Sequence, residues 1–274
     1  MKEKIKEKLK YFTIGEWILW ASSVLVIIVT YFVFHIDNYI TLAGSIVGVT
    51  SLIFCAKGNP IGQALMILFS ILYAINSYKF AYYGEMITYL GMTTPMAMLS
   101  MISWLKNPYK GDKKQVKINK IKGKEIVFSL FLTTAVTVAF YFILKALNTT
   151  NLIISTISVA TSFFAVYFTF RRSPLHSIGY ALNDIVLIIM WIMATIQDKG
   201  YLSTVICFLV FLINDIYILT NWIRLHKKQV LNDNQDLKND NESISEAQAD
   251  SEAQAGSEAQ VDSEALSETE THEN

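Results

Sequence analysis

Eight apolar runs of about 20 residues, separated by short polar loops, occupy most of the chain up to Ile223. An α-helix of this length crosses the roughly 30 Å of hydrocarbon in a bilayer. The runs are Trp17 to Phe34, Tyr39 to Ala56, Ile61 to Tyr78, Met86 to Leu105, Ile126 to Leu144, Leu152 to Phe170, Leu175 to Ile196, and Tyr201 to Ile223. The pattern therefore predicts an all-α polytopic membrane protein with eight spans.

Positive charge gathers in every second loop. The basic segments are the leader 1–16, Lys57, residues 106–124, Arg171 with Arg172, and the stretch from Arg224 to Lys228. Because Lys and Arg accumulate on the cytoplasmic side, we expect both termini in the cytoplasm and a multi-pass protein of the inner or plasma membrane. The first ten residues fit either an amphipathic helix on the anionic leaflet or a solvated segment.

The composition divides the chain into a basic body and an acidic tail. Hydrophobic residues make up 53% of the chain and its formal net charge is zero, yet residues 1–231 hold 22 of the 23 Lys and Arg. Residues 229–274 are polar and acidic, with a degenerate SEAQAD hexad from Ser245 onward. Such a segment cannot bury a core, so we predict a disordered cytoplasmic tail, with a helix as the alternative.

An internal repeat is visible at an offset of 114 to 118 residues. Asn59-Pro60 corresponds to Ser173-Pro174, and Trp104 corresponds to Trp222. Both copies start on the predicted cytoplasmic side, so the repeats are parallel. The predicted plan is a transporter-like core at 36–228, with three-span repeats at 39–105 and 152–223, a linker helix at 126–144, and an extra helix at 17–35.

Two Asn-Asp pairs lie inside apolar runs. Asn183-Asp184 and Asn214-Asp215 are each about eight or nine residues from the basic end of their run, which places them at similar depth. An ionisable residue there costs about 2.5 to 3.5 kcal/mol on insertion scales, so it marks a candidate functional site. No apolar run contains a Lys or Arg to pair with these carboxyls.

Other polar and aromatic residues share helix faces with these pairs. The candidate binding residues are Asn183, Asp184, Trp191, His176, Asn214, Asp215, Tyr217, Gln63, Tyr73 and Thr88. Amides beside aromatic rings suit a neutral or cationic ring compound with hydroxyls and a carboxamide. The structural alternative for each Asn is a bond between helices worth about 0.6 kcal/mol. For His176 it is an interfacial position, and for Tyr217 and Trp191 an ordinary place in the core.

The sequence lacks the common catalytic and nucleotide-binding motifs. It has no Walker A loop, no HExxH and no GxSxG, and its two cysteines both fall inside apolar runs. We therefore expect no enzyme activity, no metal site, no cofactor and no nucleic-acid partner. A gradient or chemical trapping of the product would have to power transport.

The last predicted span carries Asn214-Asp215-Ile216-Tyr217 followed by Asn221-Trp222, and a core span begins with Tyr83-Gly84-Glu85. With the parallel three-one-three plan, these residues resemble the PnuC-type vitamin transporters over roughly residues 37–224. The resemblance implies a fold similar to the SWEET sugar transporters and a homotrimer. It also implies facilitated diffusion of nicotinamide riboside, an NAD precursor, with cytoplasmic phosphorylation trapping the product.

One departure from that family concerns ring stacking. Nicotinamide riboside carriers often have Trp-x-x-Trp ahead of the Asn that Asn183 matches, and here His176 and Gly179 hold the two Trp positions. We expect the substrate ring to be stacked differently, which leaves thiamine, riboflavin and deoxynucleosides as alternative substrates. A membrane sensor or scaffold that signals through the tail is the alternative outside transport.

Overall fold

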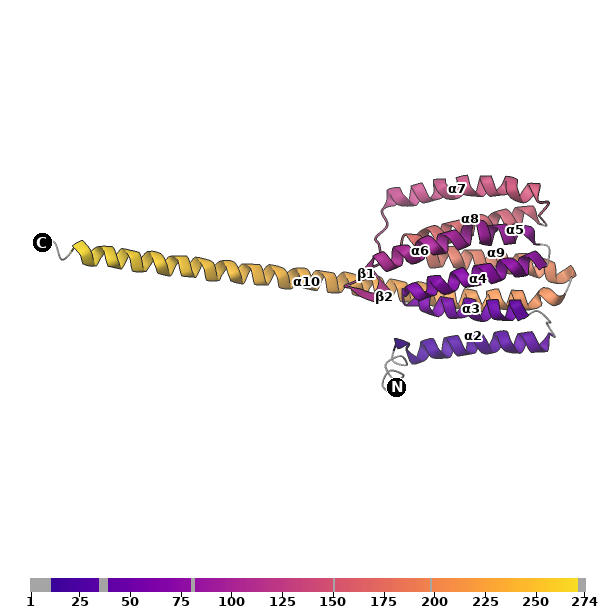
Figure 1. Cartoon of the computed structure of the whole chain (residues 1–274), viewed down its shortest axis with the longest axis horizontal. Coiled ribbons are helices and arrows are strands. Elements are labelled where there is room, and N and C mark those ends of the chain that lie inside the picture. Colours follow the sequence, from indigo (N-terminus) through magenta and orange to yellow (C-terminus); the bar gives the residue numbers. More distant parts are fainter. Residues whose placement is uncertain (1–10, 35–38, 80–81, 150, 198, 271–274) are drawn as a thin grey trace. The chain divides into compact units, whose positions relative to one another are not determined.

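The computed structural model describes residues 11–34, 39–79, 82–149, 151–197 and 199–270. Its elements, drawn in Figure 1, are α2 (Ile14–Val33), α3 (Tyr39–Ala56), α4 (Pro60–Lys79), α5 (Tyr83–Thr88), η1 (Tyr89–Thr93), α6 (Thr94–Lys106), β1 (Pro108–Tyr109), β2 (Asp112–Val116), α7 (Gly123–Ala146), α8 (Leu152–Phe170), α9 (Leu175–Gln197), η2 (Lys199–Tyr201) and α10 (Leu202–Glu270). The chain divides into two units, residues 1–225 and 226–274. The lysine-rich leader predicted at residues 1–10 and the loop around Asp37 lie outside the described residues.

Seven helices of the described part are long and apolar enough to cross a membrane, namely α2, α3, α4, α7, α8, α9 and the first part of α10. The eighth predicted span, Met86 to Leu105, is divided among α5, η1 and α6. In η1 the helix widens to a π-turn, in which the Thr94 N–H donates to the carbonyl of Tyr89. Pro95 follows at the start of α6 and has no N–H to donate, so the break falls where the α-helical ladder is weakest.

The turns after α3 and α8 have the same conformation. Gly58 at φ 67° and Arg172 at φ 56° both adopt left-handed backbone. The next residue caps the following helix in each turn, since Asn59 Oδ1 accepts from the Ile61 N–H over 3.0 Å and Ser173 Oγ accepts from the Leu175 N–H over 3.3 Å. The corresponding residues are 114 positions apart, as in the repeat seen in the sequence.

The segment between α6 and α7 joins these two turns. β1 and β2 pair as an antiparallel hairpin, and at its end the Val116 N–H donates to the Gly58 carbonyl over 2.9 Å. Three residues later the Asn119 N–H donates to the Arg172 carbonyl over 3.0 Å. One lysine-rich segment therefore hydrogen-bonds to both turns, the one after α3 and the one after α8. We call this side the basic end of the unit.

Two tryptophans cross between the halves at the basic end. Trp104 Nε1 on α6 donates to the Thr169 carbonyl at the end of α8 over 2.9 Å. Trp222 Nε1 on α10 donates to the Cys55 carbonyl at the end of α3 over 2.8 Å. The two indole rings lie 5.4 Å apart between centroids. The third helix of each predicted repeat, α6 or α10, is thus bonded to the first helix of the other, α8 or α3.

Helices α2 and α7 lie at opposite edges of the first unit (Figure 1). α7 packs on α8, and α2 packs on α3. The Thr13 side chain caps α2 and Glu16 completes a capping box, which explains why the helix begins at Ile14. Since α2 and α7 lie at the edges, the remaining helices form the centre in which a buried site can lie.

The second unit is helical over residues 226–270, where α10 continues to Glu270. The sequence favoured a disordered tail here and left helix as the alternative, because Ala, Glu and Gln have high helix propensity. In the structure these residues form helix. The boundaries assigned to the tail and to the repeats stay predictions.

Candidate functional site

A buried cavity lies among six elements of the first unit: α3, α4, η1, α8, α9 and α10. We call it the central cavity, and its lining residues are Leu52, Met66, Phe69, Tyr89, Thr93, Ser162, Val166, Tyr180, Asn183, Asp184, Phe208, Phe211 and Asp215. Both halves of the predicted repeat contribute to this wall. Three of the residues that the sequence singled out, Asn183, Asp184 and Asp215, meet in it.

The side chain of Asn183 is held against α8. Its Oδ1 accepts hydrogen bonds from Thr161 Oγ1 over 2.9 Å and from Ser162 Oγ over 2.8 Å, with Ser158 Oγ at 3.4 Å. These hydroxyls fix the orientation of a side chain that is 5% exposed. Since the amide oxygen is engaged by α8, the Nδ2 group is the part of Asn183 suited to a ligand carbonyl or hydroxyl.

Asp184 on α9 and Asp215 on α10 form a carboxyl pair. They are 4% and 2% exposed, and both line the central cavity. One oxygen of each group, Asp184 Oδ2 and Asp215 Oδ1, has no hydrogen-bond partner in the described part of the chain. The pair is therefore a buried acidic group with unused acceptor capacity, and it faces the central cavity.

Aromatic rings enclose the rest of the cavity. Phe69 and Phe211 lie 5.4 Å apart between ring centroids, and Phe208 lies 5.7 Å from Phe211. The rings reach this position because Gly48 has no side chain, and a Cβ there would come within 2.4 Å of Phe211 and 2.9 Å of Phe69. The cavity thus combines carboxyl, amide and hydroxyl groups with aromatic faces, as small-molecule sites commonly do.

The space in the central cavity that is open to a water molecule amounts to about 30 Å³. That volume accommodates one or two waters. A ring compound with a sugar needs far more room, since ligand pockets usually measure about 300 to 1,000 Å³. A substrate of that size would require the surrounding helices to move apart, which alternating-access transporters do around a central site.

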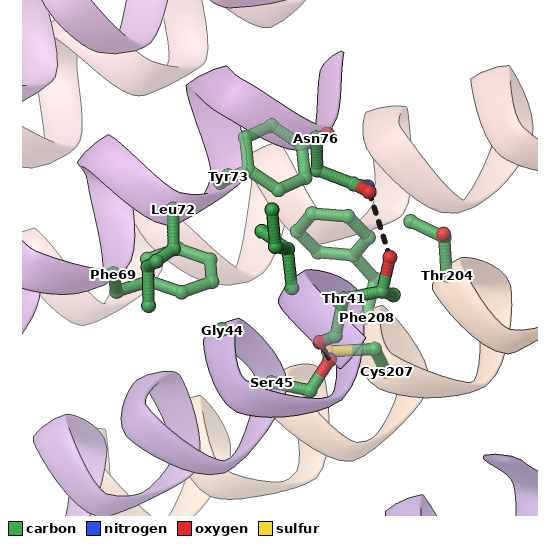
Figure 2. A pocket seen from close by; sticks show the side chains of 11 residues that line it. Thr41, Gly44, Ser45, Phe69, Leu72, Tyr73, Asn76, Thr204, Cys207 and Phe208 are labelled. Atoms are coloured by element: carbon green, nitrogen blue, oxygen red, sulfur yellow. Dashed lines mark hydrogen bonds between the residues drawn. The ribbon is translucent and has the colours of Figure 1, made fainter. Parts of the chain in front are cut away.

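A second cavity lies at the other side of two of these rings. Figure 2 shows its lining, which includes Thr41, Ser45, Asn76 and Thr204, and Thr41 Oγ1 donates to Asn76 Oδ1 over 2.7 Å. Phe69 and Phe208 line both cavities. These two rings therefore contact both cavities.

Five other predicted residues do not line the central cavity. Trp191 Nε1 donates to Tyr73 Oη over 3.0 Å, and Tyr73 lines the second cavity. Gln63 Nε2 lies 3.3 Å from Cys55 Sγ, and Thr88 Oγ1 donates to the Gly84 carbonyl over 2.9 Å. His176 is 2% exposed and packs edge-on against Trp222 at the basic end. As substrate contacts these residues stay predictions.

Asn214 and Tyr217 contact α2 instead of the central cavity. Asn214 Nδ2 donates to Ser23 Oγ over 3.1 Å and to the Val210 carbonyl over 2.8 Å. Tyr217 Oη donates to Glu16 Oε1 over 3.0 Å. Both side chains attach the N-terminal helix to α10, and their predicted contact with a substrate is likewise not tested by this placement.

The two positions that differ from the Trp-x-x-Trp pattern are shaped by local packing. A Cβ at Gly179 would lie 2.7 Å from Ala165 Cα and 2.8 Å from Ala165 N, so α8 and α9 approach closely there. A large ring does not fit at Gly179 unless the two helices separate. Aromatic faces in the central cavity come instead from residues such as Tyr89 and Tyr180.

Tyr180 is a cavity residue that the sequence reasoning missed. It precedes Asp184 by four positions on α9 and therefore shares its face. That spacing was a usable signal. Ser162 was also missed, because the hydroxyl-rich face of α8 carries no titratable group and reads as ordinary packing between membrane helices.

Three comparisons with known proteins match the same group of transporters. A family model described as nicotinamide mononucleotide transporter matches residues 38–224. The nicotinamide riboside transporter PnuC of Neisseria mucosa is 25% identical over 215 residues, which are 77% of this chain and 81% of that protein. A crystal structure of the vitamin B3 transporter PnuC matches with a TM-score of 0.70 and 21% identity, over 80% of this chain and 94% of that chain. The last comparison shows a shared fold, and α2 ends before the region matched by the family model.

Proposed function

Because the chain belongs to the nicotinamide mononucleotide transporter family, which includes PnuC-type proteins, we propose that it takes up nicotinamide riboside or a closely related vitamin. It is a multi-pass membrane protein, and the membrane we assign to it is the plasma or inner membrane. The observation that carries the proposal is the convergence of Asn183, Asp184 and Asp215 in one buried cavity between helices of both halves. A central site between two repeats is the usual arrangement in secondary transporters.

The transport mode we propose is facilitated diffusion. Substrate moves down its gradient, and a separate cytoplasmic kinase traps it by phosphorylation. The sequence contains no Walker A loop, which supports a carrier without ATP hydrolysis of its own. Ion-coupled transport is the alternative mode, because buried carboxyls such as Asp184 and Asp215 can bind a proton or another cation.

The arrangement we propose is two parallel repeats, residues 39–105 and 152–223, with the helix at 126–144 restoring the orientation between them. The recurrence of the two turns and the crossed bonds of Trp104 and Trp222 support it. Both termini are cytoplasmic in this proposal, since the basic end carries the lysine-rich segment. By likeness to its relatives, the assembly is a homotrimer.

The test is uptake of radiolabelled nicotinamide riboside by cells that lack their own carrier. Expression of the chain should confer uptake, and Asn183→Ala should abolish it at equal membrane expression. Thr195→Ala is a matched control on the same helix, because among the described residues its hydroxyl bonds only to the carbonyl of Trp191 one turn earlier. Normal uptake by Asn183→Ala would remove Asn183 from the site.

The identity of the vitamin is decided by a ligand panel on the purified protein. Nicotinamide riboside, thiamine, riboflavin and deoxynucleosides are compared by the shift that each causes in the unfolding temperature. A true ligand stabilises in proportion to the logarithm of its concentration over its dissociation constant. Stabilisation by thiamine alone would assign the chain to that substrate and reject nicotinamide riboside.

A further inference from the structure

The Asp184–Asp215 pair has no counter-charge within the membrane-spanning part of the chain. No Lys or Arg occurs in any of the eight apolar runs. The cavity residues that surround the pair are hydroxyl, amide, aromatic and aliphatic side chains, among them Tyr89, Tyr180 and Asn183. A buried carboxylate without a partner is costly by several kcal/mol, so such a pair indicates a partner that arrives from outside.

The placement of the pair favours a positively charged partner. Asp184 and Asp215 are 4% and 2% exposed, and both line the central cavity. Two carboxylates held in one cavity repel each other, so a cation that enters the cavity would stabilise their ionised form. Asp184 Oδ2 and Asp215 Oδ1 are buried without hydrogen-bond partners among the described residues. The pair therefore offers unused acceptor oxygens to a positively charged group in the cavity.

The surroundings favour an organic cation over a metal ion. Among the residues that the structure describes, no group of three or more His, Cys, Asp or Glu could hold a metal ion. Calcium alone would need six to eight oxygen ligands. The rings of Phe69, Phe211 and Tyr89 present faces that attract a flat organic cation by cation–π interaction. An anionic group such as a phosphate would be repelled by the pair.

We propose that Asp184 and Asp215 together form the counter-charge for a positively charged ring of the substrate. The transporter then selects quaternary pyridinium or thiazolium compounds over uncharged rings of the same shape. This inference rests on the proposed function and names the feature of the substrate that the site recognises.

The test compares nicotinamide riboside, whose ring is cationic, with its 1,4-dihydro form, which keeps the carboxamide and ribose but has an uncharged ring. Unfolding of the purified full-length chain is followed at increasing concentrations of each compound. To reach the same rise in unfolding temperature, the wild-type protein should need about a tenfold lower concentration of the cationic riboside than of the uncharged riboside. A close charge pair that is shielded from water contributes more binding free energy than a tenfold difference in affinity requires. Asp184→Asn and Asp215→Asn keep the side-chain shape and should each lose this preference.

Glu85→Gln is the matched control. Glu85 is another buried carboxyl, 1% exposed, but it does not line the central cavity. This variant should retain the preference for the cation, and size-exclusion profiles check that all variants fold. If Asp184→Asn does not fold, Asp215→Asn alone tests the proposal.

The outcomes separate the inference from the proposed function. Stabilisation by none of the vitamins would overturn the proposed function. Equal stabilisation by the charged and uncharged ribosides, or a preference kept in both Asn variants, would leave the function standing and overturn the counter-charge. Uptake driven by an imposed proton gradient, with no preference for the cation, would assign the pair to protons and would overturn it as well.

Discussion

Asn214 donates a hydrogen bond to Ser23, with 3.1 Å between Nδ2 and Oγ, and this bond joins α10 to the N-terminal helix α2. The adjacent residue Asp215 lines the central cavity. Neighbouring positions on a helix point about 100° apart, so one Asn-Asp pair contacts two different parts of the protein. Asn214 therefore contacts α2, whereas Asp215 lines the central cavity.

The first prediction concerns that amide. Asn214→Ala and Ser23→Ala should lower stability by a similar amount, about 0.6 to 1 kcal/mol, because both remove the same interhelical bond. Thermal unfolding in detergent measures this loss, and uptake per molecule should stay near the wild-type rate in both variants. Loss of uptake in Asn214→Ala, with Ser23→Ala unaffected, would instead make Asn214 a substrate contact.

The second prediction concerns the attachment of α2 near the basic end. Glu16 is 2% exposed, and it accepts hydrogen bonds from Lys57 Nζ over 3.1 Å and from Tyr217 Oη over 3.0 Å. Glu16→Ala should cost roughly 1.5 to 3 kcal/mol, since it removes bonds to a charged group. Limited proteolysis should then cut the segment before α3 more readily. Tyr217→Phe is the partner variant and should reproduce part of the loss.

Unchanged unfolding and proteolysis in Glu16→Ala would contradict this account of how α2 is held. The control is Ser22→Ala, on the same helix, because Ser22 is exposed and, within the described part of the chain, its hydroxyl bonds only to the carbonyl of Leu19. That variant should behave as the wild-type protein does.

The third prediction concerns Gly179. Gly179→Ala should destabilise the protein by about 1 to 3 kcal/mol, because the added methyl group meets the backbone of Ala165 at 2.7 Å. Gly179→Trp should fold poorly and should not improve uptake of nicotinamide riboside. Expression, unfolding temperature and uptake are the measurements. A well-folded Gly179→Trp with faster uptake would contradict the close packing of α8 and α9.

The fourth prediction concerns the acidic tail. Deletion of residues 232–274 should leave uptake unchanged, since the last residue that lines the central cavity is Asp215. A sensor that signals through the tail would lose its output on the same deletion. The rate of uptake per molecule therefore discriminates between the transporter and the sensor.

Periodicity and charge predicted much of the fold, because runs of bilayer length and the loops between them are local properties. The two Asp residues of the central cavity were also predictable, since a carboxyl without a basic partner inside an apolar run is anomalous wherever the helix is packed. The different positions of Asn183 and Asn214 were not separable in sequence. Both follow the same pattern, and only the packing of α2 over α10 turns Asn214 away from the cavity.

The rest depended on contacts between distant segments. Phe69 and Phe211 fit against Gly48 because it has no side chain, and these three residues lie on three different helices. The local sequence around Gly48 does not predict this contact. The break at η1 was only half predictable: Pro95 indicated a kink, but the π-turn that carries Tyr89 and Thr93 into the cavity lies before it. The repeat paired Trp104 with Trp222 in sequence, but it did not predict that each indole bonds to a helix of the other repeat.

The most direct test of the proposed function is counterflow of labelled nicotinamide riboside in proteoliposomes that contain the purified chain and no ion gradient. Vesicles loaded with unlabelled nicotinamide riboside should accumulate the label, and vesicles with Asn183→Ala should not, while Thr195→Ala should match the wild-type chain. Absence of counterflow with nicotinamide riboside, thiamine, riboflavin and deoxynucleosides alike, or equal rates in Asn183→Ala, would contradict a facilitator that works through the central cavity.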